Sequence, residues 1–86
     1  MSEQLIGKVT HYFGKPHVAA IQITDGELRV GDTVHIRGHT SDFKQTIDSM
    51  QIEHAAVQQA KPGDNIGIQV LEHAHEHDQV YRVTPD

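Results

Sequence analysis

The chain of 86 residues contains no cysteine and no tryptophan, and its aromatic residues are two tyrosines and two phenylalanines. The lack of cysteine excludes disulfides, thiolate metal ligands and cysteine nucleophiles. Because apolar residues make up 36% of the chain and aromatic residues 5%, the core must be built mainly from aliphatic side chains. The length fits a single domain, which we assign to residues 1–86.

Long hydrophobic runs and basic charge are also scarce. No apolar stretch approaches the roughly 20 residues of a membrane-spanning helix, and the first residues lack the pattern of a signal peptide. We therefore expect a cytoplasmic protein without a membrane partner. The formal net charge is −5, and residues 45–86 hold two basic against seven acidic side chains. Nucleic-acid binding would need the first half, where five basic residues balance five acidic ones.

Apolar residues recur at every second position through most of the chain, as in Ile66, Ile68 and Val70. This alternation is typical of strands with one buried face, and Gly, Pro or Asp turns separate the runs. Seven short strands predict an all-β sandwich or small barrel, and a closed barrel leaves fewer sheet edges exposed. We expect residues 25–30 to form a turn or a single helical turn. The predicted strands are Ile6–Phe13, Val18–Ile23, Thr33–Arg37, Phe43–Ile52, His54–Gln58, Asn65–Leu71 and Gln79–Thr84.

One turn pattern occurs three times in the sequence. Gly31-Asp32 and Gly63-Asp64 each precede alternating apolar residues, and His77-Asp78 is a third copy in which histidine replaces glycine. Glycine allows a positive φ at no steric cost, and the aspartate carboxylate bonds nearby backbone N–H groups. We interpret all three as turns that start a strand in a fixed register. Equivalent positions after the first two turns predict a shared barrel interior for Val34, Ile36, Ile66 and Ile68.

Three segments occur in an order that indicates a family: Ile6–Thr10, Glu27–Val34 and Ala60–Ile68. They resemble the second, β-barrel domain of translational GTPases such as elongation factor Tu, and the resemblance covers nearly the whole chain. It implies a small antiparallel Greek-key β-barrel, in agreement with the strand pattern. The chain has no G-x-x-x-x-G-K-[ST] phosphate-binding element, so we expect a barrel that stands alone, without GTPase activity or a bound nucleotide.

The resemblance also implies a function. In elongation factor Tu this barrel helps to hold the aminoacyl end of tRNA, and in other family members it contacts ribosomal RNA or neighbouring domains. Asn65 matches the family's asparagine in that pocket. The preceding pocket positions fall on Gln51, Glu53 and His54, which differ from the family in residue type.

The first half of the chain holds residue types that suit contact with RNA. Tyr12 and Phe13 lie between Lys8 and Lys15. Exposed rings beside basic residues stack on bases, whereas phenylalanine more often fills a core, and we assign Phe13 and Phe43 to the core. The candidate RNA-binding residues are Lys8, His11, Tyr12, Lys15, Arg37 and Asn65.

Histidine is unusually frequent, with eight copies in the chain. His73, His75 and His77 alternate along one segment, which places them about 6.6 Å apart on one face if the segment is extended. Imidazole nitrogens are ligands for Zn²⁺ or Ni²⁺, and His54 is the candidate for a fourth ligand. The alternative is a solvated acidic loop without a cofactor, which the family resemblance favours.

The sequence does not favour catalysis. Ser41 has His39 and Asp42 as neighbours, but three residues of one hairpin tip do not provide the ordered Ser–His–Asp chain of a nucleophile. We therefore predict a non-catalytic, translation-factor-like binding module that contacts RNA or a protein of the translation machinery. Two alternatives stay open, a protein–protein interaction domain without RNA contact and a histidine-rich protein that binds divalent metal.

Overall fold

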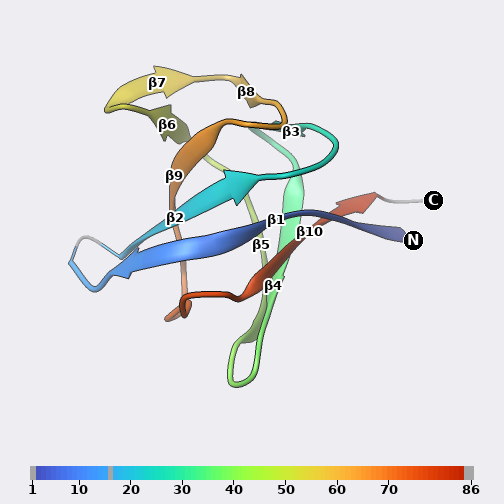
Figure 1. Cartoon of the computed structure of the whole chain (residues 1–86), viewed down its shortest axis with the longest axis vertical. Helices are drawn as coiled ribbons and strands as arrows, with labels where there is room; N and C mark the ends of the chain where they lie inside the picture. Colours follow the sequence, from blue (N-terminus) through green and yellow to red (C-terminus); the bar gives the residue numbers. More distant parts are fainter. Residues whose placement is uncertain (1, 16, 85–86) are drawn as a thin grey trace.

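The computed structural model describes residues 2–15 and 17–84, and within these ranges the chain forms strands and turns but no helix (Figure 1). The described residues thus include no helix of the length and apolarity needed to cross a membrane. All pairings between the strands are antiparallel. The all-β class predicted from the alternation of apolar residues is therefore confirmed.

Eight strands of the described chain form one curled sheet, in the order β5-β4-β10-β1-β2-β9-β6-β7, and β3 pairs with β8 in a second, two-stranded sheet. The last strand, β10, returns between β4 and β1 (Figure 1), so the predicted antiparallel Greek-key barrel type is confirmed. The strands are β1 (Ser2–Phe13), β2 (Val18–Ile23), β3 (Leu28–Arg29), β4 (Thr33–Arg37), β5 (Asp42–Thr46), β6 (Met50–Ile52), β7 (Ala55–Val57), β8 (Gln59–Ala60), β9 (Asn65–Gln69) and β10 (Gln79–Thr84).

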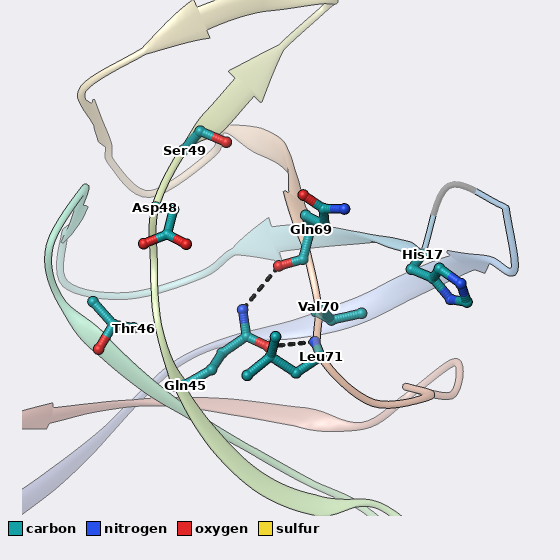
Figure 2. A pocket seen from close by; sticks show the side chains of 8 residues that line it. All are labelled: His17, Gln45, Thr46, Asp48, Ser49, Gln69, Val70 and Leu71. Carbon is teal, nitrogen blue, oxygen red and sulfur yellow. Dashed lines mark hydrogen bonds between the residues drawn. The ribbon is translucent and has the colours of Figure 1, made fainter.

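A side chain joins the sheet where β5 meets the end of β9 (Figure 2). The Gln45 amide nitrogen donates a hydrogen bond to the Gln69 carbonyl oxygen at 2.8 Å, and its amide oxygen accepts one from the Leu71 N–H at 2.8 Å. Gln45 is itself buried. Its side-chain amide therefore replaces the peptide group that a neighbouring strand would place along this edge.

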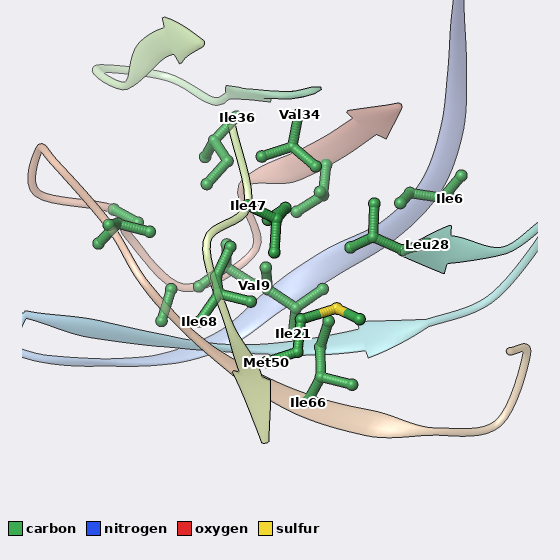
Figure 3. Close-up of a cluster of buried hydrophobic side chains, with 14 of the residues drawn as sticks. Ile6, Val9, Ile21, Leu28, Val34, Ile36, Ile47, Met50, Ile66 and Ile68 are labelled. Carbon is green, nitrogen blue, oxygen red and sulfur yellow. The ribbon is translucent and has the colours of Figure 1, made fainter. Parts of the chain in front are cut away.

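The core lies inside the curled sheet and is almost entirely aliphatic (Figure 3). Val34 and Ile36 are fully buried, and Ile66 and Ile68 are 2% and 1% exposed, which confirms their predicted position in one interior. Phe43 is also buried, as predicted. Alternate residues of β4 and β9 thus supply the interior, as a strand with one buried face requires.

The three predicted turns share one geometry. Gly31, Gly63 and His77 have φ angles of 98°, 96° and 73°. In each turn the following aspartate carboxylate accepts a hydrogen bond from the backbone N–H three residues before it, at 2.9, 3.0 and 2.8 Å. The aspartate's own N–H donates to the carbonyl of that same earlier residue. We call these the aspartate turns, and β4, β9 and β10 each begin directly after one of them.

The predicted strand Phe43–Ile52 is wrong as a single element. Phe43, Gln45 and Ile47 are buried at alternate positions, but the next buried residue is Met50, three positions further on. An odd spacing cannot keep both residues on one face of a straight strand. The chain accordingly leaves β5 before Ile47 and enters β6 at Met50, which moves it from one end of the sheet toward the other.

Two other predicted elements also need correction. The segment 25–30, expected to form a turn or a single helical turn, contains the short strand β3. This segment is extended because β3 pairs with β8, and Leu28 of β3 is fully buried. The strand predicted for His54–Gln58 begins at Ala55, because Glu53 and His54 have φ angles of 51° and 67° and form the turn between β6 and β7. A two-residue turn with positive φ at both positions is the usual connection of a tight hairpin.

A bulge in β1 overturns the prediction that Phe13 lies in the core. Strict alternation from the buried Val9 would place Phe13 inside. The pairing with β2 shifts by one residue between Val9 and His11. Tyr12 consequently packs against the core, whereas Phe13 is 47% exposed.

Truncation of a core residue tests the assignment of the interior. Ile66→Ala should lower the free energy of unfolding by about 2–5 kcal/mol, because it leaves a cavity among packed aliphatic side chains. Leu71→Ala is the control, since Leu71 is 79% exposed and its truncation should change stability by less than about 0.5 kcal/mol. Denaturant unfolding measures both, and similar values for the two variants would contradict the assignment.

A matched pair of glycine variants tests the aspartate turns. A Cβ added at Gly63 or at Gly14 would meet no described atom within 4 Å, but only Gly63 of the two has a positive φ. Gly63→Ala should therefore cost about 1–2 kcal/mol of backbone strain, whereas Gly14→Ala should leave stability nearly unchanged. Thermal unfolding of both variants checks this, and equal midpoints would show that the turn does not need the left-handed conformation.

Candidate functional site

A row of polar side chains crosses the outer face of five adjacent strands. On one side of the row, Arg37 of β4 pairs with Gln79 of β10, which pairs in turn with Lys8 of β1. On the other side, Lys8 pairs with Gln22 of β2, which pairs with Asn65 of β9. Four of the five side chains are exposed, and Gln22 is half-buried. We call this set the outer row: Arg37, Gln79, Lys8, Gln22 and Asn65.

The row brings together three of the candidate RNA-binding residues. Neighbouring strands of a sheet lie about 4.8 Å apart, so Lys8 has Arg37 on one side and Asn65 on the other, each two strands away. The register that creates this row depends on pairing between distant segments, and the sequence alone does not reveal it. Asp42 of β5 continues the row beyond Arg37, so positive charge is concentrated toward Lys8.

A hollow of about 250 Å³ adjoins the Asn65 end of the row. Ala20 and Gly67 face each other on β2 and β9, and their lack of bulk leaves this space open. Gln51, Glu53 and His54, which the family resemblance placed at pocket positions, line the same hollow as Asn65. We call this space the outer hollow; it is lined by Phe13, Val18, Ala20, Gln51, Glu53, His54, Asn65, Ile66 and Gly67.

The remaining RNA candidates lie outside the row. His11 is exposed, with its Nδ1 atom 3.3 Å from a Glu76 oxygen and its ring edge-on to Phe13. Tyr12 is half-buried, and its ring stacks on His73 with 4.2 Å between the ring centroids. Lys15 is exposed in the turn that follows β1. The six candidates thus divide between the outer row and one end of β1.

The histidine-rich segment forms a stacked column at that end of β1. His73 lies between Tyr12 and His75, and the two imidazole rings are 4.4 Å apart with planes inclined by 17°. In-plane lone pairs on two nearly parallel rings do not converge on one ion. Among the described residues, no group of three or more His, Cys, Asp or Glu side chains is placed to hold a metal ion. Zinc or nickel binding by His73, His75 and His77 therefore stays a prediction that requires the rings to turn.

Sequence reasoning missed the contact between Ser41 and His75. The Ser41 hydroxyl lies 2.7 Å from His75 Nδ1, and an Asp78 carboxylate oxygen lies 3.9 Å from the same nitrogen. A catalytic triad places its hydroxyl and carboxylate on opposite ring nitrogens, so that one orients the ring while the other exchanges a proton. The arrangement around His75 lacks this order and instead ties the β4–β5 turn to the segment before β10. His54, the candidate fourth metal ligand, lies on the separate β6–β7 turn.

Beside the outer row, His35 of β4 is held between two carboxylates. Its Nδ1 atom lies 2.8 Å from a Glu3 oxygen, and its Nε2 atom bonds Asp42. Ionised carboxylates only accept hydrogen bonds, so both ring nitrogens donate and the imidazole carries a positive charge. The hydrogen bond to Asp42, with that to Glu3, raises the pKa of His35 against the opposing effect of its burial. The hydrogen bonds to His35 lower the pKa of Glu3 and of Asp42.

Comparison with known proteins identifies the relationship of this fold. A family model described as elongation factor Tu domain 2 matches residues 17–77. The chain belongs to this family. The match includes the first two aspartate turns and Asn65, so the resemblance inferred from those segments is confirmed.

The curated relatives are longer proteins. An uncharacterized protease of Methanocaldococcus jannaschii is 36% identical over 77 residues, which cover 88% of this chain and 19% of the protease. A collagenase of Porphyromonas gingivalis is 35% identical over 78 residues, which cover 90% of this chain and 22% of the collagenase. The chain thus spans about a fifth of the length of the curated relatives that it matches.

A solved structure shares the whole fold. The C-terminal domain of a Geobacillus thermoleovorans protein described as a U32 peptidase superposes with a TM-score of 0.86 at 20% sequence identity. The superposition covers 94% of this chain and 93% of that domain. Its selenomethionine variant gives a TM-score of 0.84 over 90% of this chain and 96% of that one, at 21% identity. The barrel therefore also occurs as a C-terminal domain.

The charge on His35 leads us to expect that the stability of the fold depends on pH. Since the pKa of His35 is raised in the fold, its contribution to stability is fully present below about pH 6.5 and is lost as the pH rises through the folded value. The contributions of Glu3 and Asp42 are present above about pH 4.5 and are lost as the pH falls, because their pKa values are lowered. Their combined effect is greatest between these limits.

Thermal unfolding of the unmodified chain and of His35→Gln checks this. The difference between their melting temperatures should be largest near pH 5.5 and should shrink toward pH 9, because the neutral imidazole loses one of its two donated hydrogen bonds. A difference that stays constant from pH 5.5 to pH 9 would contradict a charged His35.

Proposed function

We propose that this chain is a non-catalytic binding module that contacts RNA through the outer row and the outer hollow. The observation that carries the proposal is the cross-strand alignment of Lys8, Arg37 and Asn65 on one exposed face, with the hollow at the Asn65 end. Family membership supports it, because the elongation factor Tu barrel helps to hold the aminoacyl end of tRNA.

The chemistry of the two features suits different parts of a nucleotide. Lysine and arginine side chains neutralise phosphates and release counterions, which makes binding favourable and sensitive to salt. In the outer hollow, Phe13 exposes a ring on which a base can stack, while the Gln51 and Asn65 amides offer both hydrogen-bond donors and acceptors. A single strand lying along the row would reach the hollow with its end.

The proposal assigns no catalytic step to this chain. Ser41 and Asp78 approach the same nitrogen of His75, which provides no proton relay through the ring. The relatives named protease and collagenase match this chain over about a fifth of their own length. We infer that the shared part serves binding and that the reactions named for those proteins belong to the rest of their chains.

A second candidate function is the binding of a protein without RNA contact. The excess of acidic residues in the second half of the chain favours it, since acidic surfaces repel phosphates. A partner in the translation machinery is compatible with both candidates, because ribosomal particles contain RNA and protein surfaces. Retention of RNA at low salt separates the two.

Charge substitution in the row tests the RNA proposal. Lys8→Glu combined with Arg37→Gln should weaken binding of a tRNA or a short unstructured RNA by about tenfold or more, and lower the salt slope by about 0.7–0.9 for each lost phosphate contact. Lys61→Glu is the control, because Lys61 is exposed and lies outside the row. Fluorescence anisotropy across a salt series measures both quantities. Equal effects of the two changes would reveal nonspecific attraction, and no binding at low salt would favour the protein candidate.

Filling the outer hollow gives an independent test. A Cβ at Gly67 would lie 3.4 Å from Val18 Cγ1, an ordinary van der Waals contact, so Gly67→Ala should fold normally. Its methyl group would occupy the floor of the hollow and weaken RNA binding without changing the salt slope. Unchanged affinity would place the RNA contact outside the hollow, and thermal unfolding confirms that the variant is folded.

A further inference from the structure

A second hollow lies further along β9, at the junction that Gln45 closes (Figure 2). It has a volume of about 280 Å³, and the sheet has no continuous backbone pairing across it in the described residues, since β6 pairs with β9 only at Gln51 and Gly67. We call this space the seam pocket; it is lined by His17, Gln45, Thr46, Asp48, Ser49, Gln69, Val70 and Leu71.

The seam pocket has the layout of a short strand-binding groove. Gln45 bonds the backbone of Gln69 and Leu71 from one wall, as a peptide group of a neighbouring strand would. The segment between β5 and β6 continues this wall outside any strand, and the end of β9 with Val70 and Leu71 forms the opposite wall (Figure 2). A further hollow of about 230 Å³ shares Ser49 and Gln69 with the seam pocket and extends the open space along β9. An elongated space beside a strand fits an extended chain better than a compact ligand.

The lining residues favour a peptide over the other classes of ligand. Asp48 is exposed and supplies the carboxylate of the pocket, and no lysine or arginine lines it, so phosphate groups would be repelled. Leu71 is 79% exposed at the rim, the most exposed large hydrophobic side chain of the described chain. An exposed leucine on one wall and a carboxylate on the other complement a peptide that carries both an apolar and a basic side chain.

We propose that the seam pocket binds an extended peptide segment of a partner protein, with a lysine or arginine directed at Asp48 and an apolar side chain packed on Leu71. This surface is separate from the outer row, so the proposal goes beyond RNA binding. The polar side chains of Thr46, Ser49 and Gln69 would bond the peptide backbone, while the two anchor side chains would select the sequence. A module of this kind joins an RNA and a protein at adjoining sites along β9, since the hollow that extends the seam pocket shares Val18, Gln51 and Gly67 with the outer hollow.

Selection from a library of short random peptides displayed on phage tests the proposal with the full chain as bait. Peptides that carry both a basic residue and a leucine, isoleucine, methionine or phenylalanine should be enriched. Asp48→Lys should weaken binding of a synthesised, enriched peptide by about tenfold or more, and Leu71→Ser by several-fold, because each removes one anchor contact. Glu72→Lys is the matched control, since it makes the same change of charge at an exposed neighbour outside the pocket.

Each other outcome would overturn the proposal. The proposal is wrong if the same peptides are enriched when the Asp48→Lys or Leu71→Ser variant is the bait. It is also wrong if the enriched peptides are acidic. Sedimentation analysis showing dimers that depend on Leu71 would identify a second copy of the chain as the occupant. Binding of a short unstructured RNA that falls with Leu71→Ser and rises with Asp48→Lys would identify RNA instead. The RNA proposal stands or falls separately, on Lys8 and Arg37, which line neither the seam pocket nor its extension.

Discussion

The three aspartate turns determine which side chains of the barrel face the core and which face solvent. Each turn ends directly before β4, β9 or β10, and its aspartate carboxylate accepts a hydrogen bond from the backbone N–H three residues earlier, which fixes the conformation in which the chain enters the strand. Because side chains alternate along a strand, a slip of one residue would exchange the two faces. The same turns that bury Ile36 and Ile66 therefore expose Arg37 and Asn65, so the outer row and the core depend on one local interaction repeated three times.

Local patterns in the sequence were sufficient to predict most of this architecture. Alternating apolar residues located the strands, and even the third turn was recognisable with histidine in place of glycine, where the structure has a positive φ. The failures arise where the alternation itself breaks. The bulge after Val9 and the three-residue step from Ile47 to Met50 depend on which distant strand lies alongside, and a pattern of apolar residues does not encode that partner.

The candidate site was predictable as residue types but not as an arrangement. Lys8, Arg37 and Asn65 could be named from charge and family resemblance, whereas their alignment needs the register of five strands. His35 alternates with Val34 and Ile36, which marks it as outward-facing, but its partner Glu3 lies 32 positions away. No periodicity in the chain signals such a contact. The outer hollow likewise exists because small residues of two strands happen to be opposite each other.

The bulge in β1 divides that strand between two tasks. Before it, Ile6 and Val9 face the core, with a second register shift between Leu5 and Gly7 in the pairing with β10; after it, Tyr12 packs against the core and is the base on which His73 and His75 are stacked. The loop before β10 is thus held from two sides, by the stack on Tyr12 and by the contact of His75 with Ser41. Loss of the inserted residue would leave a regular strand in which His11 still pairs with Ala20 and Tyr12 with the buried Ala19, so Tyr12 would keep facing the core and supporting the histidine loop. The bulge thus accommodates one extra residue on the outer surface of β1, and a change of length at that position would alter the surface beside Lys8 and His11 without rebuilding the interior.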